Sequence, residues 1–223
     1  MTHNASWPAA LITVLILLGY ELALALAQRR YPERLARSAH AALREQWFAA
    51  MSAHSGSELL AVQTLRNSLM SATMAASTAA LGLMGTATLA VPALHASIDA
   101  AADSPMFTAR LALELLLLVV LLASLVASVM AARYYHHASF VCAMPVGSAT
   151  RERWRAVGRA YVRRAGILYS WGLKHLILVV SILASILHPL AGPVAAVLVV
   201  AALVGFDRFG LRDALEGDEA SAA

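Results

Sequence analysis

Residues 111–132 of this chain read LALELLLLVVLLASLVASVMAA, and the polar sequence RYYHH follows at 133–137. Apart from Glu114, the first of these stretches holds no charged side chain. A helix of this length, rising about 1.5 Å per residue, spans roughly the 30 Å of a bilayer's hydrocarbon core. The stretch therefore predicts a transmembrane helix that ends at Arg133.

Other apolar runs repeat this pattern, so the sequence predicts an all-α bundle that crosses the membrane about five times. Hydrophobic residues make up 60% of the chain and charged residues only 13%, whereas soluble domains carry roughly 25% charged residues. We expect a single transmembrane domain over residues 1–210 and a disordered tail over 211–223. The expected spans are 8–27, 67–91, 111–132, 173–187 and 190–206.

The last apolar region allows two interpretations. As one helix, residues 173–206 would be about 50 Å long, which exceeds a hydrocarbon core of roughly 30 Å. His188-Pro189 and Gly192-Pro193 lie in its middle, and proline with glycine interrupts a helix. We expect two short spans joined by a tight external turn. The alternative is one kinked helix, which would leave four spans in the whole chain.

The basic residues predict the orientation. Sixteen of the seventeen Lys and Arg residues can be placed on one side of the bundle, and only Arg110 falls on the other side. Because loops rich in Lys and Arg stay in the cytoplasm, we expect the N-terminus outside and the C-terminus inside.

Two amphipathic helices are expected on the cytoplasmic side, one after the first span and one before the fourth. The arginines of residues 29–44 and 151–164 are expected to contact anionic lipid headgroups, and their position against the membrane argues against nucleic acid as a partner. The apolar stripes of these helices are Leu35, Ala39, Leu43, Trp47 and Met51, and Trp154, Val157, Tyr161 and Leu168.

Three short motifs resemble one family of bacterial membrane proteins. They are Arg66-Asn67-Ser68 followed by Ser77-Thr78; Arg133-Tyr134-Tyr135-His136-His137-Ala138-Ser139-Phe140 followed by Pro145; and Gly172-Leu173-Lys174 followed by His188-Pro189. The family is domain of unknown function 599, and the resemblance covers about Gly19 to Arg208. It implies an integral protein of the bacterial inner membrane and carries no activity. This chain has His136-His137 where the family has a Tyr-Asn-like pair, so the resemblance does not support a ligand role for these histidines.

The second span carries a stripe of small polar residues at helical spacing. Such residues let two helix backbones approach closely and hydrogen bond across an interface. The stripe is either a seam between helices or the lining of a water-filled path. It consists of Thr64, Asn67, Ser71, Thr78, Gly82 and Gly85.

Charged groups inside or beside the spans are candidate functional residues, because burying an unpaired charge in lipid is costly. Glu21 needs a partner, and Arg66, Arg133 and Lys174 are expected at a similar depth, as a structural ion-pair network or as a cation or proton site. Glu114 is expected to pair with Arg110 four residues before it. An outer cluster of His95, Asp99, Asp103, Glu114 and His188 is either a weak metal site or a set of solvated surface groups.

The remaining histidines offer one further hypothesis. His175 could ligate a haem together with His136 or His137, if the two histidines lay at matching depth on separate helices. The single Cys142 excludes an intramolecular disulfide and cysteine-rich metal sites. Sequence motifs of soluble hydrolases, nucleotide-binding proteins and zinc proteases are missing, so we predict no cofactor, no metal and no enzymatic activity.

Three functions are compatible with these features. The protein is a homo-oligomeric channel or transporter, an accessory subunit that packs against other membrane proteins, or a histidine-based metal or haem protein, in that order of preference.

Overall fold

The computed structural model describes residues 3–30, 36–99 and 108–221, with side chains over 6–30, 39–98 and 108–206. These residues form helices joined by short turns, and no strand occurs among them. The helices are α1 (His3–Arg30), α2 (Ala36–Ala53), α3 (Glu58–Asp99), α4 (Ala109–Ala143), α5 (Ala149–Leu187) and α6 (Ala191–Ser221). The all-α helical membrane bundle predicted from the sequence is confirmed.

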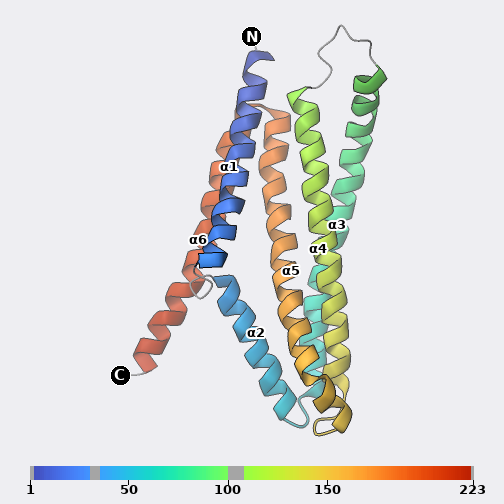
Figure 1. Cartoon of the computed structure of the whole chain (residues 1–223), viewed down its shortest axis with the longest axis vertical. Helices are drawn as coiled ribbons and strands as arrows, with labels where there is room; N and C mark the ends of the chain where they lie inside the picture. The colour runs from blue at the N-terminus through green and yellow to red at the C-terminus, as the bar shows by residue number, and fades with distance from the viewer. Residues whose placement is uncertain (1–2, 31–35, 100–107, 222–223) are drawn as a thin grey trace.

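Three long antiparallel helices form the centre of the bundle, with α4 packed between α3 and α5 along most of its length (Figure 1). Helices α1 and α6 pack against one half of α5, and α2 packs against its other half. The N-terminal end of α1 and the C-terminal end of α6 lie at opposite ends of the molecule (Figure 1).

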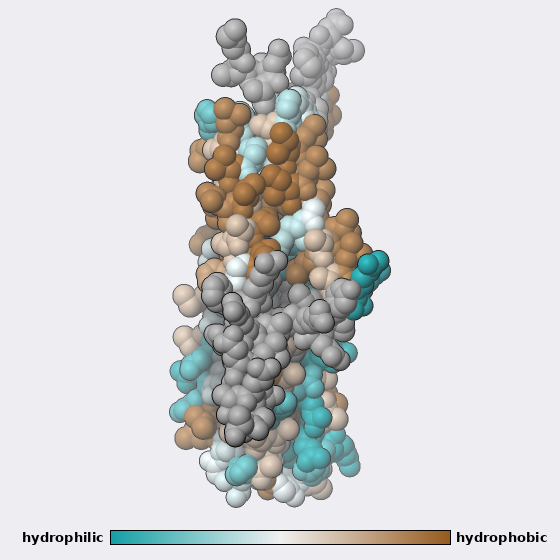
Figure 2. All heavy atoms as spheres, turned by 90° about the vertical axis from the view of Figure 1, so that its left-hand side faces the viewer, coloured by the Kyte–Doolittle hydropathy of each residue, from teal (hydrophilic) through white to brown (hydrophobic). Residues whose placement is uncertain are grey.

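The central helices are longer than a membrane is thick. Helix α4 has 35 residues, which corresponds to about 50 Å at 1.5 Å per residue. Its apolar part ends at Arg133, so the helix continues for two to three turns beyond the hydrocarbon core. Figure 2 shows this division on the face formed by α1, α6 and α2, which is apolar over one half of the molecule and polar over the other. We refer to the part that contains the apolar stretch of α4 before Arg133 as the apolar half, and to the part beyond Arg133 as the basic half.

Each half has its own hydrophobic core. In the apolar half, leucines of α4 such as Leu113, Leu117 and Leu121 pack with Leu178 and Ile182 of α5. In the basic half, the fully buried Phe48 of α2 packs among residues of α3, α4 and α5; burying one such ring contributes about 2–3 kcal/mol. The basic half is therefore a packed four-helix unit.

The tip of the basic half is fastened by one buried arginine. Arg151 of α5 is 1% exposed. Its guanidinium donates hydrogen bonds to the carbonyl oxygens of Met51 (3.3 Å), Cys142 (3.3 Å) and Met144. Glu58 lies 3.9 Å from the same guanidinium and accepts a hydrogen bond from the Val146 N–H at 3.1 Å. Through these contacts the α2–α3 turn is tied to the α4–α5 turn.

Four of the helices are long and apolar enough to cross a membrane, and the apolar part of α6 (Ala191–Phe206) is shorter. The chain reverses direction at His188–Leu190, between α5 and α6. A single kinked helix over residues 173–206 is therefore wrong. The break lies at Pro189, while Gly192 and Pro193 are in the first turn of α6, where a proline needs no N–H partner.

Several other boundaries differ from the sequence prediction. The basic segment 151–164 is the N-terminal part of the continuous helix α5, so it is not the separate amphipathic helix that we expected before the fourth span. Helix α3 continues through Pro92 to Asp99, although we expected a loop after Pro92. Helix α6 continues to Ser221, where we expected a disordered tail from residue 211. Its Leu, Ala, Arg and Glu residues are good helix formers, which is the physical reason for the extension.

The buried faces of the amphipathic helices are turned by about one residue from the predicted stripes. Leu43 and Trp154, both on those stripes, are exposed, whereas Phe48 and Val162 are buried. Leu35 lies outside the described residues. The shift arises because small neighbours such as Ala41 and Gly158 let the helices approach on that side.

Candidate functional site

The polar stripe of α3 lies on the outer surface of the bundle. Thr64, Asn67, Ser71, Thr78 and Gly85 are exposed, and Gly82 is half-buried. The buried face of α3 is instead rich in alanine, with Ala72, Ala75, Ala76 and Ala79 in its middle. Within this chain only Gly82 of the stripe packs on α4, where it faces Leu121, so a seam through the exposed members would have to be formed with another protein chain.

The hydroxyl groups of the stripe are satisfied within their own helix. Thr64 donates to the Leu60 carbonyl at 3.0 Å, Ser71 to the Asn67 carbonyl at 3.1 Å and Thr78 to the Met74 carbonyl at 3.0 Å. Such back-bonding to the preceding turn lets a serine or threonine face an apolar environment at low cost.

The outer face of α3 differs in composition from the outer faces of the other membrane helices. Those faces are aliphatic, with Leu11, Leu15, Leu18 and Leu22 exposed on α1, Val119, Leu122, Val126 and Val129 on α4, and Val194, Val197 and Leu198 on α6. On α3 the exposed residues include Met70, Met74 and Met84 beside the polar stripe, and aliphatic residues, among them Leu81, Leu89 and Val91, are exposed mainly toward its C-terminal end. Methionine and small polar residues suit adaptable helix packing better than contact with lipid chains.

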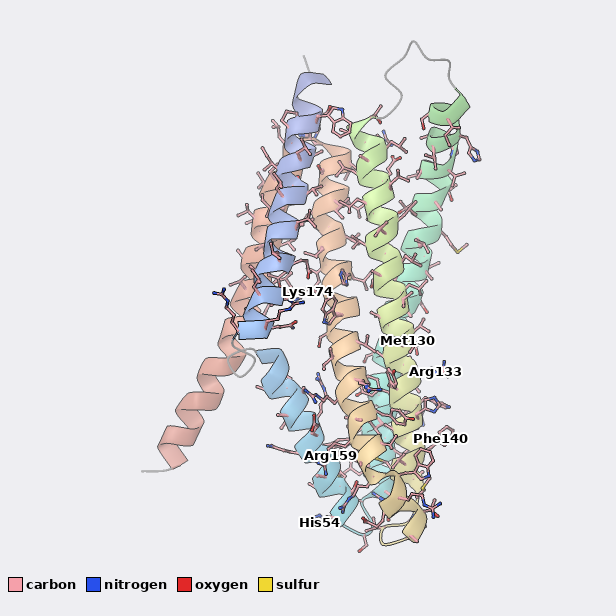
Figure 3. All side chains as sticks on the ribbon, viewed as in Figure 1. His54, Met130, Arg133, Phe140, Arg159 and Lys174 are labelled. Carbon is pink, nitrogen blue, oxygen red and sulfur yellow. The ribbon has the colours of Figure 1, made fainter. Side chains whose placement is uncertain are left out.

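The predicted charge network is only partly assembled. Lys174 of α5 is 8% exposed, and its Nζ lies 5.2 Å from the ring centre of Tyr20 on α1. Figure 3 shows Lys174 directed toward α1, with Arg133 on the outer side of α4. Arg66 and Arg133 are exposed, so neither joins Lys174. Within the described residues, the buried Glu21 Oε1 accepts no hydrogen bond.

A polar seam in the interior of the apolar half was not predicted from the sequence. Ser124 and Ser128 of α4 and Ser181 and Ser185 of α5 are buried, as is Thr13 of α1. Ser124 donates to the Gly172 carbonyl at 2.8 Å. The serines repeat at four-residue spacing on each helix, which is the small-xxx-small pattern of close helix pairs. That spacing was the available signal.

The outer cluster does not form a metal site in the part of the chain that the structure describes. No group of three metal-ligating side chains occurs there. His95 and His188 are exposed, Asp103 lies outside the described residues, and the Asp99 side chain is not described. Glu114 is buried and pairs with Arg110, whose Nε lies 2.9 Å from its carboxylate, which confirms the predicted pair.

The histidines do not meet the condition for haem ligation. His137 contacts Tyr161 with ring centres 5.6 Å apart, and Tyr161 precedes His175 by about four turns of α5. At 1.5 Å per residue, His137 and His175 are therefore separated by roughly 20 Å along the bundle. His136 lies next to His137 and packs against Phe140. The hypothesis of a haem between His175 and His136 or His137 is therefore wrong, because these histidines lie at different depths.

A groove in the basic half was also missed from the sequence. It lies where α2 covers α3, α4 and α5, and it encloses about 290 Å³. Its polar lining includes Arg44 and Tyr135, and its apolar lining includes Trp47, Leu65 and Val162. Tyr135 follows Arg133 by two residues, so the groove opens just beyond the end of the apolar half.

Comparison with known proteins places the chain in a family. No curated protein and no solved structure gives a significant match. The model of one family, described as a protein of unknown function, DUF599, matches residues 9–210. This match covers most of the chain, so the protein belongs to the DUF599 family, whose function is unknown.

Proposed function

We propose that this protein assembles with copies of itself through the outer face of α3 and acts as a channel or transporter rather than as an enzyme. The supporting observation is the composition of that face. Inside the apolar half it exposes Ser71, Thr78 and Gly85, and the stripe continues through Asn67 to Thr64 at the boundary with the basic half, whereas the outer faces of α1, α4 and α6 are aliphatic. A face of this kind is better covered by protein or water than by lipid.

A conduit is proposed between subunits because the interior of one chain is closely packed. Gly82 shows how closely α3 and α4 approach, since a Cβ there would lie 3.1 Å from Leu121 Cδ2. Around a central axis, the hydroxyl and amide groups of several α3 helices would line a polar path. Each hydroxyl could rotate from its own helix toward a passing ion or solute.

The proposed location is the bacterial inner membrane, with the N-terminus outside and the basic half in the cytoplasm. Among the arginines of 29–44, the exposed Arg29 and Arg30 directly follow the apolar part of α1 and would contact anionic headgroups. Most arginines of 151–164 lie near the start of α5, far from the apolar half, and Arg151 is buried. Only the C-terminal part of this segment is therefore proposed to contact headgroups.

Cysteine cross-linking and ion flux together test the proposal. Thr78→Cys lies on the proposed interface, and Leu18→Cys is an exposed control on α1; Cys142 is fully buried and can be retained. In liposomes that contain only this protein, mild oxidation should link Thr78→Cys into dimers and leave Leu18→Cys monomeric. The double variant Ser71→Leu and Thr78→Leu should abolish ion flux, whereas Val126→Leu on the outer face of α4 should not.

Two outcomes would contradict this proposal. If both cysteine variants cross-link equally, the contacts are random collisions. If the leucine variants conduct as well as the wild type, the stripe does not line the path.

An accessory role is the alternative, and one specific observation favours it. Because the hydroxyls of Thr64, Ser71 and Thr78 are already bonded to their own helix, the stripe needs no water and can serve as a dry contact with a different membrane protein. In that case Thr78→Cys would cross-link to another protein in native membranes and would stay monomeric in purified liposomes.

A further inference from the structure

Arg44 occupies an unusual position in the basic half. Its guanidinium occupies the space beside Gly166 of α5, where an added Cβ would be 2.6 Å from Cζ and 2.7 Å from Nε. Only a glycine leaves room for the guanidinium at this place. Gly166 of α5 therefore leaves the space in which the Arg44 guanidinium lies, beside the groove under α2.

The charge of Arg44 is not neutralised within the described part of the chain. The ion pairs found there join Arg110 to Glu114, Arg151 to Glu58, Arg155 to Glu152 and Arg163 to Glu45. None includes Arg44, and no described acceptor forms a hydrogen bond with it. Arg163, on the other side of α2, is paired with Glu45 at 3.2 Å. The half-buried Arg44 thus keeps its N–H donors available to a ligand in the groove.

The rest of the groove is suited to an amphiphile. The hydroxyl-bearing Tyr135 and the rim residue Ser68 lie on its polar side, while Trp47, Leu65 and Val162 form an apolar wall. Arginine binds phosphate through two parallel N–H bonds, and tryptophan favours the boundary between lipid chains and water. A small free anion would make no use of the apolar wall.

The depth of the groove also matches a lipid headgroup. Ser68 lies two residues inside the apolar stretch that begins after Arg66, and Tyr135 lies two residues beyond the apolar stretch that ends at Arg133, so the groove lies at this boundary. The phosphate layer of a bilayer would stand at this level. We propose that the groove binds the phosphate of an anionic membrane lipid, with Arg44 as its main ligand and Tyr135 as a second donor. Thr64 of the α3 stripe also lines this groove, so the site adjoins the face proposed for assembly, but its proposed ligands Arg44 and Tyr135 belong to α2 and α4.

Native mass spectrometry of the full chain in mild detergent tests the site. The probes are phosphatidylglycerol, phosphatidylcholine with the same acyl chains, and glycerol 3-phosphate, which has the headgroup phosphate but no chains. The wild type should retain one phosphatidylglycerol with at least tenfold preference over phosphatidylcholine. Arg44→Gln should remove this preference.

Two further variants separate the site from general effects. Gly166→Ala keeps every charge but places a methyl group where the guanidinium lies, so it should also reduce the preference about tenfold. Arg133→Gln removes an exposed charge at a similar depth and should leave the preference within twofold of the wild type. Circular dichroism and gel filtration confirm that each variant is folded.

Three results would overturn the proposal. A wild-type protein without preference would show that no such site exists. An equal loss in Arg133→Gln and Arg44→Gln would show that only surface charge attracts the lipid. Displacement of phosphatidylglycerol by glycerol 3-phosphate at equal concentration would show that the site binds a free phosphate compound instead of a lipid.

Discussion

At the scale of single residues, burial separates arginines that look alike in the sequence. Arg151 and Arg153 stand two positions apart in one basic segment, yet Arg151 is 1% exposed and holds three carbonyl oxygens, whereas Arg153 is exposed. The local sequence gives no sign of this difference. It depends on where the turns after α2 and α4 meet.

Glu58, which lies 3.9 Å from the Arg151 guanidinium, leads to a prediction about how stability depends on pH. It lies at the tip of the basic half, well outside the membrane-spanning part. Hydrogen bonds from its own backbone N–H and from that of Val146 lower the pKa of its carboxyl below the ordinary value of 4.5. A lowered pKa in the folded state stabilises the fold above the unfolded pKa, and this stabilisation is lost as the pH falls through the folded value.

Thermal unfolding of the wild type and of Glu58→Gln should therefore differ at pH 7 and converge below pH 4.5. The wild type should be the more stable protein at pH 7. Glu152→Gln, at an exposed surface pair, is the matched control and should change stability little at either pH. If the difference in stability between the wild type and Glu58→Gln stays constant with pH, the charge of the Glu58 carboxylate does not stabilise the fold.

At the scale of helices, glycine and serine decide how closely α4 and α5 approach. A Cβ at Gly172 would lie 3.3 Å from the Ser124 carbonyl oxygen, in addition to touching the Ser128 hydroxyl. Gly19, on the lipid side of α1, has nothing within 4 Å of its Cβ position. The two glycines have the same local helix preference and differ only in what surrounds them.

Gly172→Ala should therefore destabilise the protein by about 1–3 kcal/mol, because the added methyl group forces the two backbones apart. Gly19→Ala should stabilise it by roughly 0.5–1 kcal/mol through helix propensity alone. Denaturant unfolding in detergent, followed by circular dichroism, measures both effects. Equal effects at the two positions would show that α4 and α5 pack less closely than described.

At the scale of the whole molecule, the path of the chain places the two termini at opposite ends (Figure 1). An odd number of crossings has this consequence, and the reversal at His188–Leu190 provides the last one if α6 spans the membrane. Asn4→Cys should then react with a membrane-impermeant maleimide in intact cells. Asp218→Cys should react only after the cells are opened, and labelling of both positions from one side would contradict five spans.

The sequence by itself determined the class of protein, the apolar stretches that the long helices carry and the break at Pro189. These features depend on local hydropathy, charge and backbone chemistry, all of which are set by residues that are neighbours in the sequence. Only the tertiary structure decided which face of each helix is inside. The α3 stripe faces outward because its hydroxyls bond within their own helix and an alanine face packs more closely on α4. Likewise, the Arg44 groove, the Arg151 corner and the contact between Lys174 and Tyr20 join residues far apart in the sequence, so they arise only when the helices pack.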